Sequence, residues 1–410
     1  MKSNYNRIGD YIQLVDERNK GLKVENLLGL SISKQFIPSV ANIIGTDMEN
    51  YKIISKNQFA CSLMQVRRDK KMPVALLQDF DKAIISQAYP VFEVKDDKEL
   101  IPEYLMMWFS RSEFDRETCF HAVGGVRGSL EWEDFIDLKL PIPSIEKQRE
   151  IVEEYNTIQN RITLNQNLIQ KLESTAQAIY KEWFVDFEFP NEEGKPYKTN
   201  GGEMVWCEEL EKEIPKGWEV MKICSICEIT SSKRIFESEY QEKGIPFYRG
   251  KEITQKKSGE VISDIIYISK ERYNEIVKKY GKPNKGDILM TAVGTLGSTY
   301  MVEDENFYFK DGNVIWFKNF KRESSNYFLY DFMQTKQFAD LISEITIGST
   351  QSAITIKSFE QQKIVFPNQI ILERYINLSI ALNKNQDIKK KEQLVLNKLK
   401  ELLFSKLSTN

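Results

Sequence analysis

The sequence predicts an α+β protein, in which two globular mixed α/β domains are separated by two long helices packed as an antiparallel coiled coil. Three observations lead to this fold class: a long internal repeat, an unbroken helical period after each copy of the repeat, and short β-like runs within each copy. A chain of 410 residues is also too long for a single hydrophobic core, since one domain usually contains about 100–200 residues.

The repeat joins two distant parts of the chain. The turn GGVRGS at 124–129 is followed by Phe135 and by LPIP at 140–143, and the turn GSTQS at 348–352 is followed by Phe359 and by VFP at 365–367. The turns and the prolines share one offset, because position 124 corresponds to 348 and position 143 to 367. The segment 86–92 matches 311–317 at nearly the same offset. We interpret this as one large duplication with a pseudo-two-fold, rather than a solenoid.

The first long helix is predicted from its apolar period. Ser144 can cap its start, and residues 147–184 contain neither Pro nor Gly. Apolar residues then alternate at spacings of four and three, which is the pattern of a coiled-coil seam. The seam consists of Ile151, Tyr155, Ile158, Ile162, Asn165, Ile169, Leu172, Ala176, Ile179 and Trp183. Asn165 is its one polar member, and such a residue usually fixes the register.

The second long helix follows Pro367 and has a weaker seam. The predicted seam residues are Leu378, Ala381, Asn385, Ile388, Val395, Leu399 and Leu402. Glu392 and the basic run 389–391 interrupt this stripe. Because the apolar seam of one helix is buried by packing against the seam of another, we expect the two helices to pack on each other.

These features divide the chain into five parts. We predict an N-terminal domain at 1–143, a central helix at 144–187, an irregular linker at 188–216, a C-terminal domain at 217–367 and a C-terminal helix at 368–410. The linker is rich in Pro, Gly and Glu. β-like runs occur at 51–54, 74–77, 88–94, 287–291 and 314–317, and helices are expected to begin in 104–109 and 327–332.

Composition narrows the class of protein. The chain is 41% hydrophobic, and none of its apolar runs reaches the roughly 18–20 residues that span a bilayer. The N-terminus lacks a signal-peptide pattern, and five cysteines at irregular spacing fit a reducing compartment better than a disulfide framework. We therefore expect a cytoplasmic protein with no membrane contact. A net charge of −3 argues against a protein that coats nucleic acid alone.

Catalytic and cofactor motifs are weak. The single histidine, His121, has no nucleophile or acid placed beside it by the sequence. Cys224 and Cys227 form a CxxC, but KICSICEI alternates like a strand and no second ligand pair exists for zinc. The segment 244–252 has the wrong glycine spacing for a phosphate loop, with Glu252 where Ser or Thr is needed. We expect no catalysis, no metal and no cofactor bound by this chain.

Polar and basic turns do suit DNA recognition. Glycine lets a backbone approach a DNA groove closely. Arg can form bidentate hydrogen bonds with the edge of guanine, and Gln with the edge of adenine. Arg127 and Gln351 occupy equivalent repeat positions and lead the candidates, although such turns can also simply end strands. The candidate DNA contacts are Arg67, Arg68, Lys70, Arg127, Ser129, Lys233, Arg234, Arg249, Lys251, Thr295, Ser349, Thr350 and Gln351.

The sequence resembles a known family at this point. The stretch TAQAIYKEWFVDFEFPNEEGKPYKTNGGEMVW at 175–206, followed by EIPKGWEV at 213–220, is similar to the central region of specificity subunits of type I restriction–modification systems. The resemblance implies two target recognition domains, each reading half of a bipartite double-stranded DNA target. It also implies two methyltransferase subunits docked on the helices, S-adenosylmethionine bound in those partners, and an optional restriction subunit.

Two departures from the family pattern stand out. The N-terminal domain begins at RIGDYI, residues 7–12, without the Pro-x-Gly-Trp lead of the second domain. The C-terminal helix ends in LNKLKELLFSKLS, where the first ends in Trp-Phe. Identical docking of the methyltransferase on both halves is therefore in doubt. A coiled-coil scaffold without a DNA role and a free-standing enzyme are the alternative functions.

Overall fold

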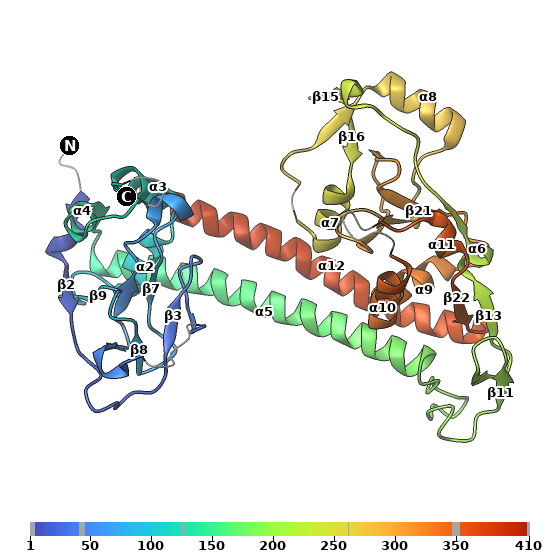
Figure 1. Cartoon of the computed structure of the whole chain (residues 1–410), viewed down its shortest axis with the longest axis horizontal. Helices are drawn as coiled ribbons and strands as arrows, with labels where there is room; N and C mark the ends of the chain where they lie inside the picture. Colours follow the sequence, from blue (N-terminus) through green and yellow to red (C-terminus); the bar gives the residue numbers. More distant parts are fainter. Residues whose placement is uncertain (1–4, 41–45, 125–127, 261, 347–352, 408–410) are drawn as a thin grey trace. The chain divides into compact units, whose positions relative to one another are not determined.

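The computed structural model describes residues 5–40, 46–124, 128–260, 262–346 and 353–407. The chain divides into two compact units, of which unit 1 comprises Met1–Thr163 and Val395–Asn410, and unit 2 comprises Leu164–Leu394. The long helices α5 (Ile145–Phe184) and α12 (Gln369–Lys406), drawn green and red in Figure 1, each contribute residues to both units. Whether 1–143 and 217–367 fold as separate domains stays a prediction.

Unit 1 is built on a four-stranded antiparallel sheet. Its strand order is β2 (Ile12–Val15), β9 (Val91–Val94), β6 (Phe59–Cys61), β7 (Val74–Leu76). Three strand pairs accompany it: β1 (Tyr5–Arg7) with β10 (Lys139–Pro141), β3 (Leu28–Leu30) with β4 (Phe36–Pro38), and β5 (Lys52–Ser55) with β8 (Lys82–Ile85). The helices are η1 (Ile8–Asp10), η2 (Met48–Asn50), α1 (Val66–Asp69), α2 (Pro102–Phe109), α3 (Ser112–His121) and α4 (Trp132–Asp137).

Aromatic rings form the centre of this unit. Phe59 and Phe92 stack on neighbouring strands with ring centroids 5.0 Å apart, and Phe109 of α2 meets Phe59 edge-on. Phe135 of α4 packs against Phe92 and Phe109. The helices that follow the sheet in sequence are thereby fixed onto it by large buried apolar surfaces.

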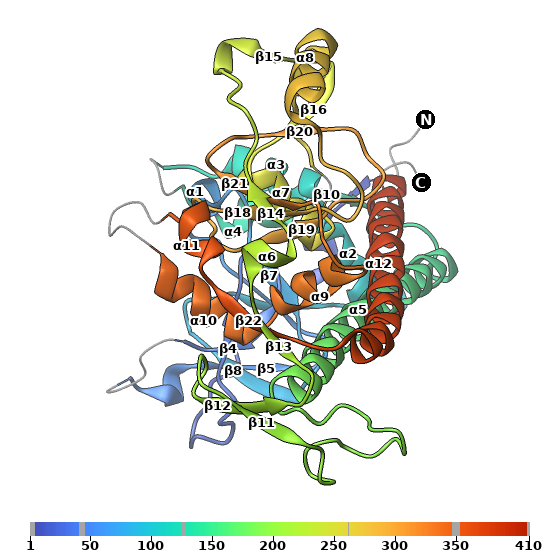
Figure 2. The same ribbon diagram turned by 90° about the vertical axis from the view of Figure 1, so that its right-hand side faces the viewer.

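Unit 2 contains a matching antiparallel sheet in the order β14 (Glu228–Thr230), β21 (Val314–Lys318), β18 (Ile288–Thr291), β19 (Thr299–Met301). A second sheet has the order β15 (Tyr240–Gln241), β17 (Ile266–Ile268), β16 (Ile245–Tyr248), β20 (Tyr308–Phe309). Two further pairs are β11 (Met204–Cys207) with β12 (Lys212–Pro215), and β13 (Glu219–Lys222) with β22 (Lys363–Phe366). The helices are α6 (Ile223–Ile226), η3 (Glu237–Glu239), α7 (Gly250–Ser258), α8 (Lys270–Tyr280), α9 (Ser325–Phe332), α10 (Lys336–Ile345) and α11 (Ile356–Glu360). Within this unit, α8 and the second sheet extend away from α9 and α10 (Figures 1 and 2).

The duplication is confirmed by the elements themselves. The starts of α3 and α10, of α4 and α11, of β10 and β22, and of α5 and α12 all differ by the same offset as the turns and prolines. Both four-stranded sheets also have the same connectivity. The predicted α+β class with two repeated globular parts and two long helices is correct, and the predicted runs lie in β5, β7, β9, β18 and β21.

Side chains just before each long helix cap its first turn. The Ser144 hydroxyl accepts from the backbone N–H of Lys147 at 3.4 Å, and the Asn368 carbonyl oxygen of the side chain accepts from that of Ile371 at 3.0 Å. These acceptors satisfy N–H groups that have no partner inside the helix. The predicted cap at Ser144 is confirmed.

The two helices contact each other within each unit. In unit 1, the rings of Tyr155 and Phe404 pack with centroids 5.6 Å apart, and Lys400 Nζ donates to Gln159 Oε1 at 2.8 Å. The two helices therefore run antiparallel. In unit 2, Tyr375 of α12 meets Phe184 of α5 at 4.7 Å. On α5, Ile151, Ile162 and Asn165 are buried, while Ile158, Ile169, Leu172 and Ile179 are half-buried.

The predicted seam of α12 is wrong. Leu378, Ile388, Val395, Leu399 and Leu402 are 45–58% exposed, and Ala381 and Asn385 are exposed as well. The buried positions are instead Ile371, Leu372, Tyr375, Ile376, Ser379, Leu403 and Phe404, on a largely opposite face of the helix. Both sets follow helical spacing, so α12 carries two stripes, and the aromatic residues were left out of the predicted one.

Two smaller predictions also need correction. The linker 188–216 is not wholly irregular, because β11 and β12 pair in register from Met204 with Pro215 to Cys207 with Lys212. The segment KICSICEI does not form one strand, since Ile223–Ile226 is a helical turn, with β13 before it and β14 after it. Tertiary packing of Ile223 and Ile226, both fully buried, outweighs the local alternation here.

Candidate nucleic-acid interface

In unit 1 a basic helix and the end of the glycine-rich turn lie together. Arg67 and Arg68 belong to α1, and Lys70 follows it in a left-handed conformation. The Arg67 N–H donates to the Gly128 carbonyl at 3.4 Å. Gly128 has φ +37°, and a Cβ there would stand 2.6 Å from the Arg67 Cβ. Glycine is therefore required at this contact.

The same turn is closed by backbone pairing. Val123 and Ser129 exchange both hydrogen bonds at 2.9 Å, and the Leu130 N–H donates to the Leu63 carbonyl at 2.9 Å. The Cys119 thiol donates to the Val66 carbonyl at 3.3 Å, which ties α3 to α1. Two candidate groups that are far apart in sequence, Arg67 of α1 and Ser129, thus lie together on one surface of unit 1. We call this surface the basic edge of unit 1.

The charge on this edge is only partly compensated. Arg68 donates to Asp69 from Nε at 2.6 Å and from Nη2 at 3.1 Å, which raises the pKa of Arg68 and lowers that of Asp69. This pair lies at the surface, so it contributes little stability. Arg67, Lys70 and Lys71 are exposed as well. The edge is positive, as a DNA phosphate contact requires.

Unit 2 has an equivalent edge with different side chains. The Thr291 N–H donates to the Ser298 carbonyl and the Gly297 N–H to the Thr291 carbonyl, each at 2.9 Å, and this closes a turn that exposes Thr295. The Ile354 N–H donates to the Ala292 carbonyl at 3.0 Å. That bond corresponds to the one between Leu130 and Leu63, since Ile354 and Leu130 hold equivalent positions in the repeat. The exposed turn with Thr295 therefore holds the position in unit 2 that Arg67 holds on the edge of unit 1.

Lys233 and Arg234 lie elsewhere in unit 2, in a basic groove that the sequence did not predict. Its lining residues are Lys233, Arg234, Arg272, Glu275, Ile276, Lys278, Lys279 and Tyr280. Lys233 lies 4.7 Å from the centre of the Tyr280 ring, and Arg234 pairs with Asp311 at 3.1 Å. The sequence had predicted Lys233 and Arg234 as candidates, and the run Lys278-Lys279-Tyr280 at the end of α8 was a further signal for the groove. A groove lined mainly by lysine and arginine side chains suits a phosphate backbone.

Arg249 is engaged inside the protein. Its guanidinium donates to Glu252 from Nη2 at 2.6 Å and from Nε at 3.2 Å, and its N–H also donates to this carboxylate at 2.7 Å. Glu252 is 1% exposed. Burial raises the pKa of Glu252, but the bonds to Arg249 outweigh that effect and lower it. The position fits a helix cap for α7 better than a DNA contact.

Lys251 is a weaker case. Its side chain is exposed and lies 4.0 Å from Asp264. The leading candidates Arg127 and Gln351, together with Ser349 and Thr350, lie outside the described residues. Their roles stay predictions. Gly128, which follows Arg127, contacts Arg67 as described above, and Ala353 forms a β-bridge with Val293.

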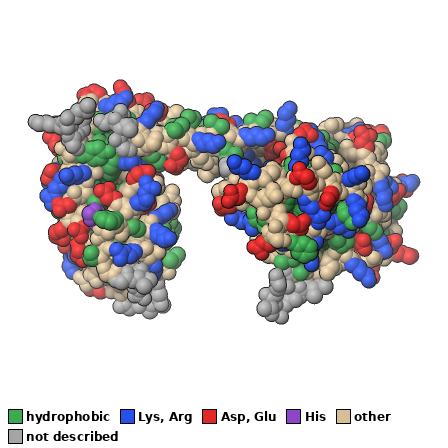
Figure 3. All heavy atoms as spheres, turned by 90° about the horizontal axis from the view of Figure 1, so that it is seen from above, with side chains coloured by type: hydrophobic (Ala, Val, Ile, Leu, Met, Phe, Trp, Pro, Cys, Tyr) green, Lys and Arg blue, Asp and Glu red, His purple; other side chains and the backbone are tan. Residues whose placement is uncertain are grey.

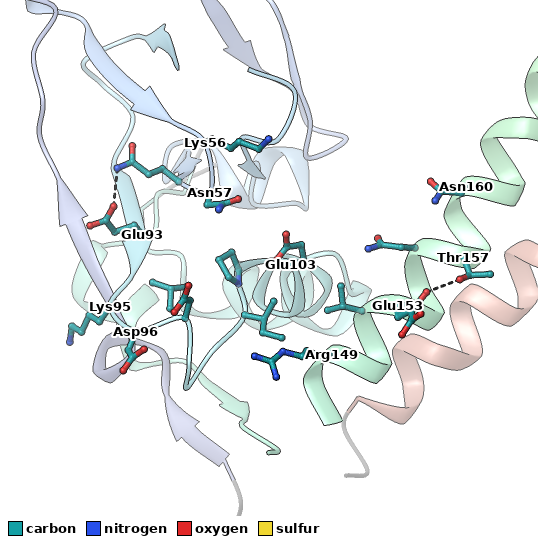
Figure 4. A pocket seen from close by; sticks show the side chains of 17 residues that line it. Lys56, Asn57, Glu93, Lys95, Asp96, Glu103, Arg149, Glu153, Thr157 and Asn160 are labelled. Atoms are coloured by element: carbon teal, nitrogen blue, oxygen red, sulfur yellow. Dashed lines mark hydrogen bonds between the residues drawn. The ribbon is translucent and has the colours of Figure 1, made fainter. Parts of the chain in front are cut away.

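A large cleft in unit 1 does not suit DNA (Figure 4). It lies between the sheet, the start of α2 and the first turns of α5, and inside it Gln58 donates to Glu93 at 2.9 Å. Acidic side chains outnumber basic ones in its lining: Lys56, Lys95 and Arg149 stand against Glu93, Asp96, Asp97, Glu103 and Glu153. An excess of carboxylates repels phosphates.

Catalytic chemistry finds little support in the described ranges. Burial raises the pKa of the Cys227 thiol to about 12, so this cysteine is not a thiolate. His121 is exposed at the end of α3 and packs edge-on against Phe120. Across residues with described positions, His, Cys, Asp and Glu form no cluster of three suited to a metal ion. Among those residues, too, no helix has the length and apolarity to cross a bilayer.

Comparisons with known proteins agree on one family. A family model described as "Type I restriction modification DNA specificity domain" matches residues 41–174 and 215–393. The type I restriction enzyme MjaIX specificity subunit of Methanocaldococcus jannaschii is 26% identical over 317 residues, 75% of this chain and 68% of that protein. The putative type I restriction enzyme specificity subunit S.HindORF215P of Haemophilus influenzae is 31% identical over 149 residues, 36% of each protein. A crystal structure of a type I restriction–modification S subunit from M. genitalium shares the fold, with a TM-score of 0.58 and 14% identity over 98% of this chain and 95% of that one.

Proposed function

Because the chain belongs to the family of type I restriction–modification DNA specificity domains, we propose that its two units each read one half of a bipartite double-stranded DNA target. The chain is a specificity subunit of a type I restriction–modification system. In our proposal it recognises DNA, catalyses no reaction, and works in the cytoplasm. Methyl transfer and its S-adenosylmethionine belong to partner methyltransferase subunits.

The observation that carries this proposal is a repeated scaffold with different edges. The sheets and the helices α3 and α10 recur, whereas one edge bears Arg67 and Arg68 and its equivalent bears Thr295. A scaffold that joins proteins has no need for such a difference. Two readers of unlike half-sites do need it, because each base pair shows a different pattern of donors and acceptors.

The exposed stripe of α12 supports a partner role for the helices. Leu378 and Ile388 in unit 2, and Val395, Leu399 and Leu402 in unit 1, are about half exposed. Regular apolar side chains on the outer face of a helix are typical of a site for another helix. We propose that two methyltransferase subunits dock on the helices, that a restriction subunit is a further partner, and that the helices set the gap between half-sites.

Mutation of the basic edge of unit 1 and of the basic groove of unit 2 tests the proposal. In the complex with its methyltransferase, Arg67→Ala should weaken methylation of only one half-site, and Lys233→Ala only the other. Lys195→Ala, an exposed lysine of unit 2 that is not a candidate DNA contact and does not line the groove, is the control for lost charge. We expect effects of about 1–3 kcal/mol for a base contact and a smaller salt slope for a phosphate contact.

Arg127→Ala and Gln351→Ala test the two leading candidates in the same assay. Methylated motifs mapped across a genome report which half-site is relaxed. Uniform loss at all sites would contradict base recognition. Tight specific binding by the isolated chain would contradict partner dependence, and methyl transfer or DNA cleavage by it would favour a free-standing enzyme.

A further inference from the structure

Three apolar side chains are exposed around the basic edge of unit 1: one on the last turn of α3, one just after it and one just before α1. Phe120 is 82% exposed, Val123 is 58% exposed and Met64, just before α1, is 51% exposed. The Phe120 ring meets the His121 ring edge-on at 5.4 Å. The histidine is the purple group in Figure 3, next to hydrophobic side chains drawn green.

Neighbouring contacts fix these side chains against the basic residues. Cys119, the residue before Phe120, donates to the carbonyl of Val66, which directly precedes Arg67. Val123 pairs with Ser129 across the turn. Phe120 is therefore held next to the positive edge by a helix with fixed position, while its own ring remains in solvent. Leaving a phenylalanine exposed forgoes about 1.5–3 kcal/mol of burial, which binding to a partner surface would recover.

The repeat places a different residue at the same position in unit 2. The helices α3 (Ser112–His121) and α10 (Lys336–Ile345) keep the repeat offset at both ends, so Phe120 corresponds to Glu344. Glu344 is exposed too. The helix α10 is also packed on the equivalent loop, because a Cβ at Gly297 would lie 3.2 Å from the side chain of Ile342.

The two side chains differ in what they can recognise on DNA. An apolar side chain contacts the C5-methyl group of thymine, whereas a carboxylate accepts a hydrogen bond from the N4 amino group of cytosine. A carboxylate close to phosphates is otherwise repelled, so Glu344 needs such a donor. We propose that the position shared by Phe120 and Glu344 determines specificity, with Phe120 contacting a thymine methyl and Glu344 a cytosine amino group.

This inference rests on the proposed function of the two edges. It adds a base-reading position on α3 and α10 to the loops and turns already described. It also assigns different base chemistry to the two half-sites, without reference to the residues that lie outside the described ranges.

The test uses the full chain in complex with its methyltransferase and synthetic duplexes of the mapped target. Replacing each half-site thymine in turn by uracil removes only the methyl group. At one such position the wild type should lose about tenfold in affinity, of the order of one base contact. Phe120→Ala should show that loss already on thymine and lose nothing more on uracil, whereas Phe120→Leu should retain most of the contact.

The matched control is Phe80→Ala, an exposed phenylalanine of unit 1 in the loop between β7 and β8. It should bind like the wild type. For unit 2, Glu344→Ala should lose discrimination at one cytosine of the other half-site, measured with a pyrimidinone base that lacks the amino group. Its matched control is Asp340→Ala, one turn earlier on α10.

Each outcome decides the inference. Wild-type affinity of Phe120→Ala for the thymine duplex would overturn the thymine contact. So would a further loss on uracil in Phe120→Ala as large as the one the wild type shows. If Arg67→Ala weakens one half-site while Phe120→Ala does not, only this inference fails. If both variants bind like the wild type, the proposed DNA edge itself is wrong.

Discussion

Asp331 offers the sharpest test of how the second recognition unit is fixed to its long helix. It lies on α9, and its carboxylate accepts hydrogen bonds from the Tyr375 hydroxyl at 2.9 Å and from the Ser379 hydroxyl, both on α12. All three side chains are buried. Tyr375 also packs on Tyr180, Trp183 and Phe184 of α5. The carboxylate therefore joins α9 to the helix pair.

Asp331→Ala should destabilise this region by about 2–4 kcal/mol. The change leaves two buried hydroxyl groups without their acceptor, at about 1–3 kcal/mol each, and this loss is partly offset because a buried carboxylate is removed. Asp331→Asn keeps an acceptor oxygen and removes the buried charge, so a smaller change than for Asp331→Ala is expected.

Hydrogen exchange of peptides from α9 and the first half of α12 measures the effect locally. A loss of about 2–4 kcal/mol speeds exchange about 30- to 700-fold. Asp340→Ala on α10, where the aspartate is exposed, is the control and should exchange like the wild type. Unchanged protection in Asp331→Ala would refute the role assigned to this carboxylate.

The pH dependence of this group has a definite sign. Burial raises the pKa of Asp331 above its ordinary value of 3.8, against the opposing hydrogen bonds from Ser379, Tyr375 and Asn383. The folded state thus holds the proton more tightly than the unfolded chain, so this contribution to stability is complete below pH 3.8 and is lost as pH rises through the folded pKa. Relative to Asp331→Asn, the wild type should become less stable over that window in denaturant titrations. An opposite slope would show that the hydrogen bonds outweigh burial.

Three further predictions concern other parts of the chain. Arg249→Ala should lower the free energy of unfolding by about 1–3 kcal/mol, and with it the thermal midpoint, because the buried Glu252 carboxylate loses its partner. If the variant keeps its full stability and loses affinity for DNA, Arg249 is instead a DNA contact. Cys227 should resist alkylation by iodoacetamide at pH 8 in the folded protein, since burial raises its thiol pKa to about 12; rapid labelling under native conditions would contradict its burial. A heptad inserted after Leu172 and another after Asp387 lengthens each helix by about 10 Å, so the methylated motif should keep its half-sites and gain a longer gap; activity on the original gap alone would exclude the helices as the ruler.

Several features of the fold were determined by local sequence. The constant offset of the turns and prolines defined the duplication, because both copies retain glycines and prolines where the chain must turn. The first long helix followed from the 40 residues between Ile145 and Phe184, which contain no helix breaker and begin after a capping serine. Residues adjacent in sequence carry such signals, so no tertiary contact was needed to read them.

Part of the candidate interface was also visible in the sequence. Arg67 and Ser129 were singled out separately, as basic residue and turn residue. Their meeting could not be foreseen, because it depends on a left-handed glycine against Arg67 and on strands that return from distant segments. The groove of Arg272, Lys278 and Lys279 around Lys233 was missed for the same reason.

The sequence by itself determined the duplicated plan, the long helices and the family resemblance. Only the tertiary structure decided which of two apolar stripes on α12 is buried. Both stripes follow the same helical period, and Tyr375 is buried because it contacts the aromatic residues of α5 and Asp331 of α9. It also decided that Arg249 pairs with a buried carboxylate while Arg67 faces solvent. The sequence alone does not distinguish these two arginines. They differ because the carboxylate of Glu252, the partner of Arg249, is buried in the fold.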